Sequence, residues 1–497
     1  MLRVAGSRAL VSASSASLPP VVRWPAVGAG RLVLAGSIAT DPGAASGGYD
    51  ELVREAAGPH RPARPDPREE LLVTFTADGA AALAGPEWLR RRRVHAYEEL
   101  GVTPLPSEKE DVWRYAPIEM LDLDAYSPVG APAPAPAPGG MLARLAPDGA
   151  CITVDGTRAG TGPVDLPAGV TVAGPRAQGD LGSVLVGGDA LVRLHDAFVP
   201  DAVVIDVAPG VVAERPIVVV HWCSGALDGQ GRAPAMFPHT VVRVGRGAEV
   251  SVVEVLAGVP GAGPGLVVPV TELDVDDGGR LAYVGVQVLG PEVWHIGRLA
   301  ARAGTDALLA SFTLGLGGSY ARLRTDAAAT GPRARCELRA AYVGSSDQVH
   351  DIRTLQDHVA PRTTSDLLCK GAVSDSAHSI YSGLIRVRRG AVRSEAMQTN
   401  HNLVLDERAH ADSVPNLDIE ENDVRCTHAS TVGPVDEDQL YYLESRGVTP
   451  ERAERLIVLG FFDDIVARSP VPATVGPLAD EVAARLDRIT TRGAFDG

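Results

Sequence analysis

The sequence contains almost no lysine and no closely spaced cysteines, and each absence excludes a class of site. Lysine occurs only at Lys109 and Lys370, and neither stands in a G-x-x-x-x-G-K-[ST] loop, so the chain has no P-loop for a nucleotide. Its five cysteines are scattered without a C-x-x-C pair, which argues against a disulfide framework and a self-contained four-cysteine metal site. This cysteine usage favours a reducing cytoplasm.

Long apolar runs, excess positive charge and common catalytic motifs are also missing. No run approaches the roughly 20 apolar residues that a membrane-spanning helix needs. The net charge of −16 disfavours binding to the nucleic-acid backbone. There is no G-x-S-x-G, no H-E-x-x-H and no G-x-G-x-x-G between a strand and a helix, so these hydrolase and oxidoreductase signatures are excluded. We interpret the basic run from Arg90 to Arg93 as a solvated helix face.

The first forty residues are rich in Arg, Ser and Ala and have no acidic residue before Asp41. A transit peptide has this composition. So does upstream sequence translated from a misplaced start codon, which we favour because no convincing amphipathic helix is present. Residues 1–66 are therefore left unassigned and are predicted to be disordered or to precede the native start.

The pattern of residues 67–130 predicts a helical N-terminal region. Pro86 suits the start of a helix and Gly101 its end. Ser107 and Glu110 have the spacing of a capping box. The segment 131–140 reads APAPAPAPGG and predicts an extended linker, because alternating proline excludes a regular helix or a central strand.

Residues 141–432 predict a β-rich domain with almost no helical period. Short runs rich in Val, Leu, Thr and Ile recur at intervals of roughly 8–12 residues, which is typical of a sandwich, a propeller or a β-solenoid. The absence of a blade-length repeat with a fixed aromatic dipeptide weakens the propeller. The clearest runs are Pro216–His221, Thr240–Val244, Glu249–Val255, Leu281–Leu289, Leu308–Leu314 and Ile380–Val387.

Residues 433–497 predict a helical C-terminal region. Asp436 is placed to cap a first helix that Gly447 ends, and Pro450 opens a second helix. Leu456, Leu459, Phe462 and Val466 form its predicted apolar stripe, which Ile457, Phe461 and Ile465 widen. A third helix carries Leu478, Val482, Leu486 and Ile489 on one face. The second helix has more apolar residues than one contact needs, which indicates a second surface.

Cys426 and His428 are the strongest candidate metal ligands. They lie in a strand-like run from Val424 to Val432, and period-2 geometry places Val424, Cys426, His428 and Ser430 on one face. A thiol and an imidazole do not complete a tetrahedral site, so further donors must come from elsewhere in the chain or from another subunit. Alternatively, Cys426 packs as a small apolar residue and His428 bonds a turn.

From Gln398 to Val466 the chain has two strand-like runs, the Cys426-x-His428 pair and two punctuated helices, in that order. This order resembles the C-terminal core of the SufB/SufD family, scaffold components of the Suf iron–sulfur cluster assembly machinery. Trp113-Arg114-Tyr115 also resembles a signature near the start of SufD proteins. The resemblance implies a right-handed parallel β-helix core with helical regions on both sides. These helices are expected to cap the open ends of the core.

The resemblance further implies a scaffold without ATPase activity that works inside a complex. His428 and Cys426 would handle iron or a nascent cluster, transiently and shared with a SufB-like subunit. The C-terminal helices would bind a SufC-like ATPase through Tyr441, Tyr442, Leu443, Arg446, Gly447, Phe461 and Phe462. A cysteine desulfurase system would act indirectly, nucleic acid and membrane would not be partners, and flavin is left open.

Within the family the chain is more similar to SufD than to SufB. The sulfur-accepting cysteine of SufB precedes a Pro–x–hydrophobic–Glu run, which corresponds here to Pro415-Asn416-Leu417-Asp418. No cysteine occurs between Glu407 and Val414, and Ala429 replaces the glutamate that follows the SufB histidine. The alternatives are a SufB-like paralogue, a homodimeric β-helix scaffold, and a polysaccharide-acting β-helix enzyme that would use carboxylates such as Asp351, Asp357 and Asp375.

A second collection of possible ligands falls on successive predicted coils. We interpret these residues mainly as satisfied polar groups at solenoid turns, although lateral stacking would bring some of them together. The group consists of His350, Asp351, Asp357, His358, His378, His401 and His410.

Overall fold

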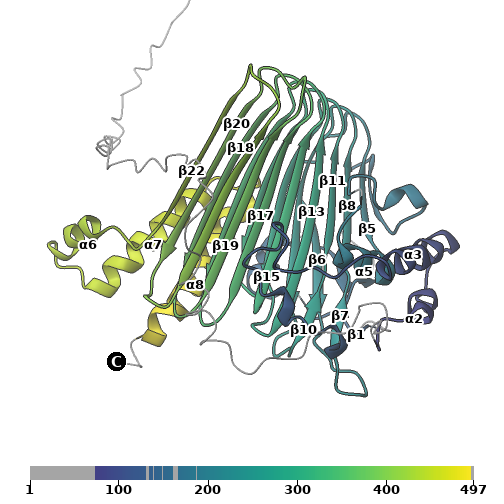
Figure 1. The fold of residues 1–497 in the computed structure, drawn as a ribbon, viewed down its shortest axis with the longest axis horizontal. Helices are drawn as coiled ribbons and strands as arrows, with labels where there is room; N and C mark the ends of the chain where they lie inside the picture. Colours follow the sequence, from purple (N-terminus) through teal and green to yellow (C-terminus); the bar gives the residue numbers. More distant parts are fainter. Residues whose placement is uncertain are drawn as a thin grey trace, which may run out of the picture. The chain divides into compact units, whose positions relative to one another are not determined.

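Two long β-sheets dominate the computed structural model (Figure 1). The structure describes residues 73–129, 134–137, 139–147, 149–159, 166–185 and 187–493. The segment 1–66 and four of the ten residues of the proposed linker 131–140 lie outside these residues. The described residues belong to one compact unit that begins at Arg64.

The twelve-stranded sheet contains β4 (Val170–Ala173), β5 (Val203–Val207), β8 (His239–Val244), β11 (Val270–Val275), β13 (Val293–Ala303), β15 (Tyr320–Ala329), β17 (Val349–His358), β19 (His378–Val387) and β21 (His410–Ile419), with β1 (Tyr126–Pro128), β7 (Ala233–Met236) and β10 (Gly265–Val267) at its side. The ten-stranded sheet contains β3 (Thr157–Ala159), β2 (Cys151–Val154), β6 (Ile217–Cys223), β9 (Glu249–Gly258), β12 (Arg280–Val288), β14 (Leu308–Gly315), β16 (Arg335–Gly344), β18 (Thr364–Val373), β20 (Glu395–Val404) and β22 (Arg425–Gly433).

From β13 onward the chain alternates between the sheets, and each strand pairs in parallel with the strand two positions later. Tyr320, Val349, His378 and His410 stand in one column across β15, β17, β19 and β21. This arrangement is a β-solenoid, which confirms the predicted fold class. Each of the six runs predicted as strands lies largely or wholly within a strand.

The space between the two sheets is filled by side chains of the inward-facing positions. Val242 and Leu273 of one sheet share an apolar cluster with Val252 and Leu281 of the other, and all four are almost fully buried. Burying a Val or Leu side chain contributes roughly 1.5–3 kcal/mol. The alternation of inward and outward residues is therefore what holds the coils closed.

Three helices pack together near the first coils: α2 (Ala77–Ala82), α3 (Glu87–Leu100) and α5 (Ala190–Phe198). The interpretation of Arg90 to Arg93 as a solvated face is wrong for Arg93. Its side chain is fully buried and donates to the carbonyl oxygens of Leu83, Ala84, Val199 and Pro200, which compensates for burying the charge. Burial lowers the pKa of Arg93 to about 10.

Helices also occur inside the range predicted as strands alone. They are α4 (Met141–Leu145), the 3-10 turn η3 (Gln178–Asp180) and α5. Asp189 caps α5 by accepting from the backbone N–H groups of Leu191 and Val192. Such a cap is a sequence signal for a helix start.

The segment around Trp113 lies against the outer face of the twelve-stranded sheet. The guanidinium of Arg322 stacks 3.8 Å from the centre of the Trp113 ring and donates to the carbonyl of Val112. Arg353 donates to the carbonyl of Arg114. Two further 3-10 turns, η1 (Ile118–Met120) and η2 (Leu123–Ala125), lead from this segment to β1.

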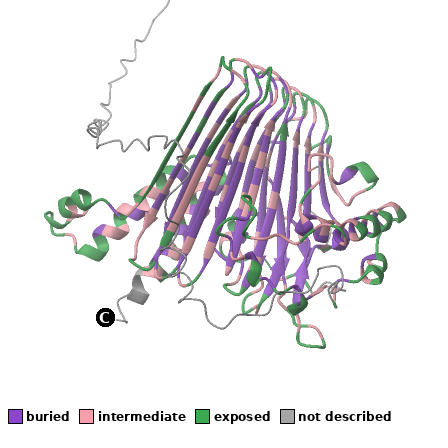
Figure 2. Cartoon of the chain, viewed as in Figure 1, coloured by how far each residue is buried: buried purple, intermediate pink, exposed green. Residues whose placement is uncertain are grey.

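The C-terminal helices are α6 (Glu437–Glu444), α7 (Pro450–Val466) and α8 (Val475–Gly493), with the turn η4 (Pro472–Thr474) before α8. They do not cap the end of the solenoid as expected. Instead, α7 and α8 cover the outer face of the ten-stranded sheet, where Phe462 and Leu478 share an apolar cluster with Val343 and Leu368. The last coil, β21 and β22, is therefore left uncovered (Figure 2).

Across the described part of the chain, no helix combines the length and apolar character required to cross a bilayer.

Buried histidines predict a loss of stability in acid. Burial lowers the pKa of His195 and His350 to about 3 and that of His295 and His358 to about 4. In the unfolded chain a histidine has a pKa near 6.5. Because the unfolded state then binds more protons, the free energy of unfolding should fall below pH 6.5, by about 1.4 kcal/mol per pH unit for each such histidine.

The measurement is chemical denaturation between pH 7.5 and pH 4.5. His350→Phe keeps an aromatic ring on Tyr342, with which His350 now stacks at 5.6 Å, and should make the dependence on pH shallower. His95→Ala removes an exposed imidazole and should leave it unchanged. Equal slopes in all three proteins would contradict the assignment to His350.

Candidate functional site

The last coil of the solenoid exposes positions that are buried in every earlier coil. Leu417 and Ile419 of β21 continue the inward column positions of Gln356 and His358, yet each remains 41% exposed because no further coil covers it. Val432 of β22 is 45% exposed for the same reason. The end of the interior is thus open, and both final strands present a free backbone edge.

Cys426 and His428 lie at this opening. In-register pairing places Cys426 beside Ala396 and His428 beside Gln398, and both of these β20 residues are buried inward-facing positions. Parallel partners in register point to the same side of a sheet, so Cys426 and His428 face the interior. His428 is exposed, whereas Cys426 is half-buried against an apolar cluster that includes Val424.

Part of the interior next to this opening is polar, beside the apolar cluster that contacts Cys426. Gln398, Asn400 and Asn402 of β20 are almost fully buried. The Oδ1 atom of Asn400 accepts from Ser413 at 2.9 Å, and Ser413 accepts from Ser430 at 2.6 Å. Ser430 thus shares the inward face of β22 with Cys426 and His428, as the strand pattern predicts.

Gln398 has neither amide atom hydrogen-bonded within the described part of the chain, although its side chain is fully buried. An unpaired buried polar group costs about 1–3 kcal/mol. Gln398 pairs in register with His428, so an unpaired donor and acceptor are buried at the strand position next to it.

The five cysteines differ sharply in access. Cys151, Cys223, Cys336 and Cys369 are buried, and burial raises the pKa of Cys151 to about 11 and that of Cys336 and Cys369 to about 12. Their thiols stay protonated and unreactive. Cys426 is the one cysteine that solvent reaches, and partial burial raises its pKa as well.

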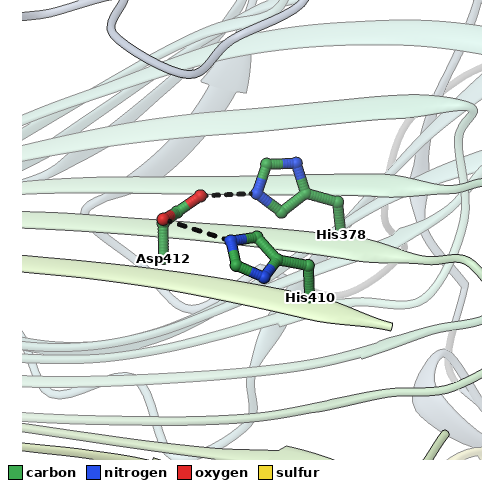
Figure 3. Close-up of side chains that lie close together, drawn as sticks. All are labelled: His378, His410 and Asp412. Carbon is green, nitrogen blue, oxygen red and sulfur yellow. Dashed lines mark hydrogen bonds and ion pairs between the residues drawn. The ribbon is translucent and has the colours of Figure 1, made fainter. Parts of the chain in front are cut away.

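Two members of the second ligand group meet on the outer face of the twelve-stranded sheet. His378 of β19 pairs in register with His410 of β21, and Asp412 lies two residues beyond His410 (Figure 3). The Oδ2 atom of Asp412 is 2.7 Å from Nε2 of His378, and its Oδ1 atom is 3.4 Å from Nε2 of His410. Lateral stacking has therefore assembled a cluster of three donors.

The remaining members are occupied elsewhere, in line with the interpretation as satisfied polar groups for most of them. Asp351 pairs with Arg322 and Arg353, Asp357 pairs with Arg388, His358 bonds Thr363 and Ser365, and His401 bonds Thr431. His350 is the exception, because both of its ring nitrogens are buried without a hydrogen-bond partner among the residues that the structure describes.

The carboxylates proposed for a polysaccharide-acting enzyme do not form a common site. Asp351 is fully buried in its arginine pairs, and Asp357 is engaged with Arg388. Asp375 accepts from the backbone N–H of Ser346 in a turn. These contacts are structural, so the acid pair that glycosidic cleavage requires is not assembled from these residues.

The predicted partner surface on the C-terminal helices is partly exposed. Tyr441 and Tyr442 of α6 are 74% and 58% exposed, and Arg446 stacks on Tyr442. Leu443 and Phe461 are half-buried, and Gly447 turns the chain with a positive φ of 85°. Phe462 is 1% exposed and belongs to the core, so its side chain is not available to a partner in this conformation.

The predicted phase of the α7 stripe is also wrong in part. Leu456 is 44% exposed, and Val458 takes a buried position that the pattern did not select. Asp436 does cap α6, with its Oδ1 atom 2.9 Å from the N–H of Gln439. On α8, Leu478, Val482 and Leu486 are buried as predicted.

Sequence reasoning missed Asp412, Gln398 and Ser413. Asp412 lies two positions after His410, and residues two positions apart share one face of a strand. That spacing was an available signal for a ligand pair. Nothing in the local sequence distinguishes Gln398 or Ser413 from ordinary polar strand residues.

The chain matches the family described as SUF system FeS cluster assembly, SufBD core domain, over residues 227–461. An iron–sulfur cluster assembly SufBD family protein of Mycobacterium bovis is 34% identical over 53% of this chain and 67% of the relative. The SufD proteins of Bacillus subtilis and Escherichia coli are 30% and 25% identical, over 56% and 73% of this chain and 63% and 85% of their own lengths.

Lys370, one of only two lysines, fastens α7 to the sheet. Its Nζ donates to the carbonyl of Phe461 at 2.9 Å, pairs with Asp464 at 2.7 Å and lies 4.6 Å from the centre of the Phe461 ring. Lys370→Met keeps the apolar stem but removes these bonds. It should lower the free energy of unfolding by about 1–3 kcal/mol.

Lys109→Met is the matched control, because Lys109 is exposed and its ammonium has no comparable role. Denaturant melts would measure both variants, and hydrogen exchange should show faster exchange in α7 for Lys370→Met alone. A Lys370→Met protein as stable as the wild type would show that α7 is held by apolar packing only.

Proposed function

Because the chain belongs to the SufB/SufD family of iron–sulfur cluster assembly proteins, we propose that it is a SufD-type scaffold subunit of a Suf complex. In this proposal it pairs with a SufB-like subunit and binds a SufC-like ATPase. Iron or a nascent cluster is its cargo, handled transiently at the open end of the solenoid. The chain contributes binding groups and shape, and the ATPase contributes the energy.

The observation that carries the proposal is the uncovered last coil. Its exposed inward residues include the apolar Leu417 and Ile419, which a neighbouring subunit would bury. Free strand edges on β21 and β22 offer backbone hydrogen bonds to a partner. Cys426 and His428 lie at this same end, so a partner docked there would stand close enough to add the missing metal ligands.

The SufD-type role is supported by the thiols of the chain. A sulfur acceptor requires an accessible thiolate. Four cysteines are buried and protonated, partial burial raises the pKa of the accessible Cys426 and so disfavours its thiolate, and the segment between Glu407 and Val414 has no cysteine. A SufB-like partner would therefore receive sulfur, while His428 and Cys426 face the cargo.

The exposed tyrosines of α6 support an ATPase contact there. Helix α6 contains no buried residue, so its tyrosines contribute nothing to the core. Aromatic residues of this kind dominate the energetics of protein interfaces when a partner covers them. Tyr441, Tyr442, Leu443, Arg446, Gly447 and Phe461 remain in the proposed surface.

Replacing His428 tests the proposed cargo site. His428→Ala should leave the free energy of unfolding within about 0.5 kcal/mol of the wild type, because the side chain is exposed. It should abolish cluster assembly in a complex reconstituted with a SufB-like subunit and a SufC-like ATPase, measured by the absorbance of the cluster. His95→Ala should assemble clusters normally. Full assembly by His428→Ala would remove His428 from the site.

Replacing the tyrosines tests the ATPase surface. The double variant Tyr441→Ala/Tyr442→Ala should fold normally and lose at least tenfold in affinity for a SufC-like ATPase, measured by isothermal titration calorimetry. Met120→Ala, which removes another 74% exposed side chain, is the control. Point substitutions are used because removing the C-terminal helices would also remove α7 and α8, which pack on the core. Unchanged affinity would place the ATPase elsewhere.

A further inference from the structure

We infer that His378, His410 and Asp412 form a binding site for a divalent first-row transition-metal ion, separate from the site at Cys426 and His428. The nitrogen and oxygen donors of the three residues all lie within 4.8 Å of one another. Figure 3 shows both imidazoles directed at the carboxylate. The inference concerns metal binding by the isolated chain, so it does not depend on the proposed function.

The backbone holds the three donors in a fixed relation. His378 and His410 are direct neighbours on β19 and β21, and their ring centres are 5.2 Å apart. Asp412 follows His410 on the same face of β21, opposite Ile380. Because both strands belong to one sheet, the site needs no loop to close and is formed when the last coil pairs.

The site lies on the outside of the solenoid and is open to solvent. The side chains of His378 and Asp412 are 25% and 23% exposed, and that of His410 is 68% exposed. Cys426 and His428 face the interior from the other sheet. The two sets of donors therefore lie on different sheets. One set faces outward to solvent, and the other faces the interior of the solenoid.

No stronger partner competes for the carboxylate. Both oxygens of Asp412 are directed at imidazole nitrogens, and no arginine or lysine among the described residues forms a salt bridge with it. Arg353 stands in the adjoining column two coils earlier and is already paired with Asp351. By contrast, Asp418, further along the same strand, pairs with Arg386. Within the described residues, Asp412 is thus paired only with the two imidazoles.

The donor set defines the class of ion. Two imidazole nitrogens with one carboxylate oxygen suit Zn²⁺, Fe²⁺ and Co²⁺, which bind such ligands at about 2.0–2.2 Å. Small rotations of the three side chains would bring their donors around one ion. Ca²⁺ and Mg²⁺ prefer all-oxygen sites and would bind poorly. With three protein ligands, positions remain open for water or for a donor from another molecule.

Cobalt titration of the full-length chain tests the inference, because Co²⁺ in a nitrogen–oxygen site has visible absorption bands without the charge-transfer band of a Co²⁺–thiolate bond. The wild-type protein should bind one Co²⁺ with this spectrum, and excess Zn²⁺ should displace it. His410→Ala and Asp412→Asn should each weaken binding at least tenfold. Both residues lie on β21, the edge strand of its sheet, and face outward, so circular dichroism should show an unchanged fold.

Two controls separate this site from its neighbours. His401→Ala removes another imidazole of the last coils, one that bonds Thr431, and should leave Co²⁺ binding unchanged. The double variant Cys426→Ser/His428→Ala should also bind Co²⁺ normally. Wild-type affinity in Asp412→Asn, or loss of the bands in Cys426→Ser/His428→Ala, would overturn the inference. Neither result bears on cluster assembly, which is measured in the reconstituted complex.

Discussion

In-register parallel pairing between coils is the constraint on which the structure depends. Each strand pairs with the strand two positions earlier without a shift in register. Paired residues of successive coils therefore all face the interior or all face the outside. The same pairing closes the core, where Val and Leu of both sheets meet, and forms the charged rows outside, where arginine and aspartate of adjacent coils pair. Each coil therefore supplies the surface that the next coil covers. Within the described residues, the inward side chains of the last coil remain partly exposed because no further coil covers them.

The helical regions take their places from this stacking. The C-terminal helices bury Phe462 and Leu478 on the outer face of the ten-stranded sheet, and Lys370 adds a charged anchor beneath Phe461. A face offers these helices a continuous apolar surface, whereas the solenoid end offers a narrow rim of two strands. Packing on this face buries the apolar sides of α7 and α8, whereas α6 reaches the same cluster only through the partly buried Leu440. The open end and the exposed helix are two consequences of the same preference.

Much of the fold and part of the candidate site could be predicted from sequence, because both depend on local periodicity. The alternation of apolar and polar residues predicts the strands and places Cys426, His428 and Ser430 on one face. The cap residue Asp436 predicts the start of α6. What failed depended on contacts between distant residues. Helix α5 has only nine residues, so its period was too short to stand out among strands. The burial of Arg93 depends on carbonyl oxygens more than a hundred residues away. The meeting of His378 with His410 depends on coil length, which a single sequence does not reveal.

The polar lining near the opening explains why the final coils differ from the first. A solenoid gains stability from apolar interior residues, and buried amides such as Gln398 and Asn400 lower that gain. The hydrogen bond from Ser413 to Asn400 offsets part of the cost of burying the Asn400 amide. Ser413 in turn accepts from Ser430, so this chain of hydrogen bonds ends on the exposed strand β22. Gln398 recovers none of it and lies beside His428. Stability alone would favour an apolar residue at position 398. Because its amide atoms pair with no other described residue, Gln398 instead lowers the stability of the last coils by the cost of an unpaired buried group.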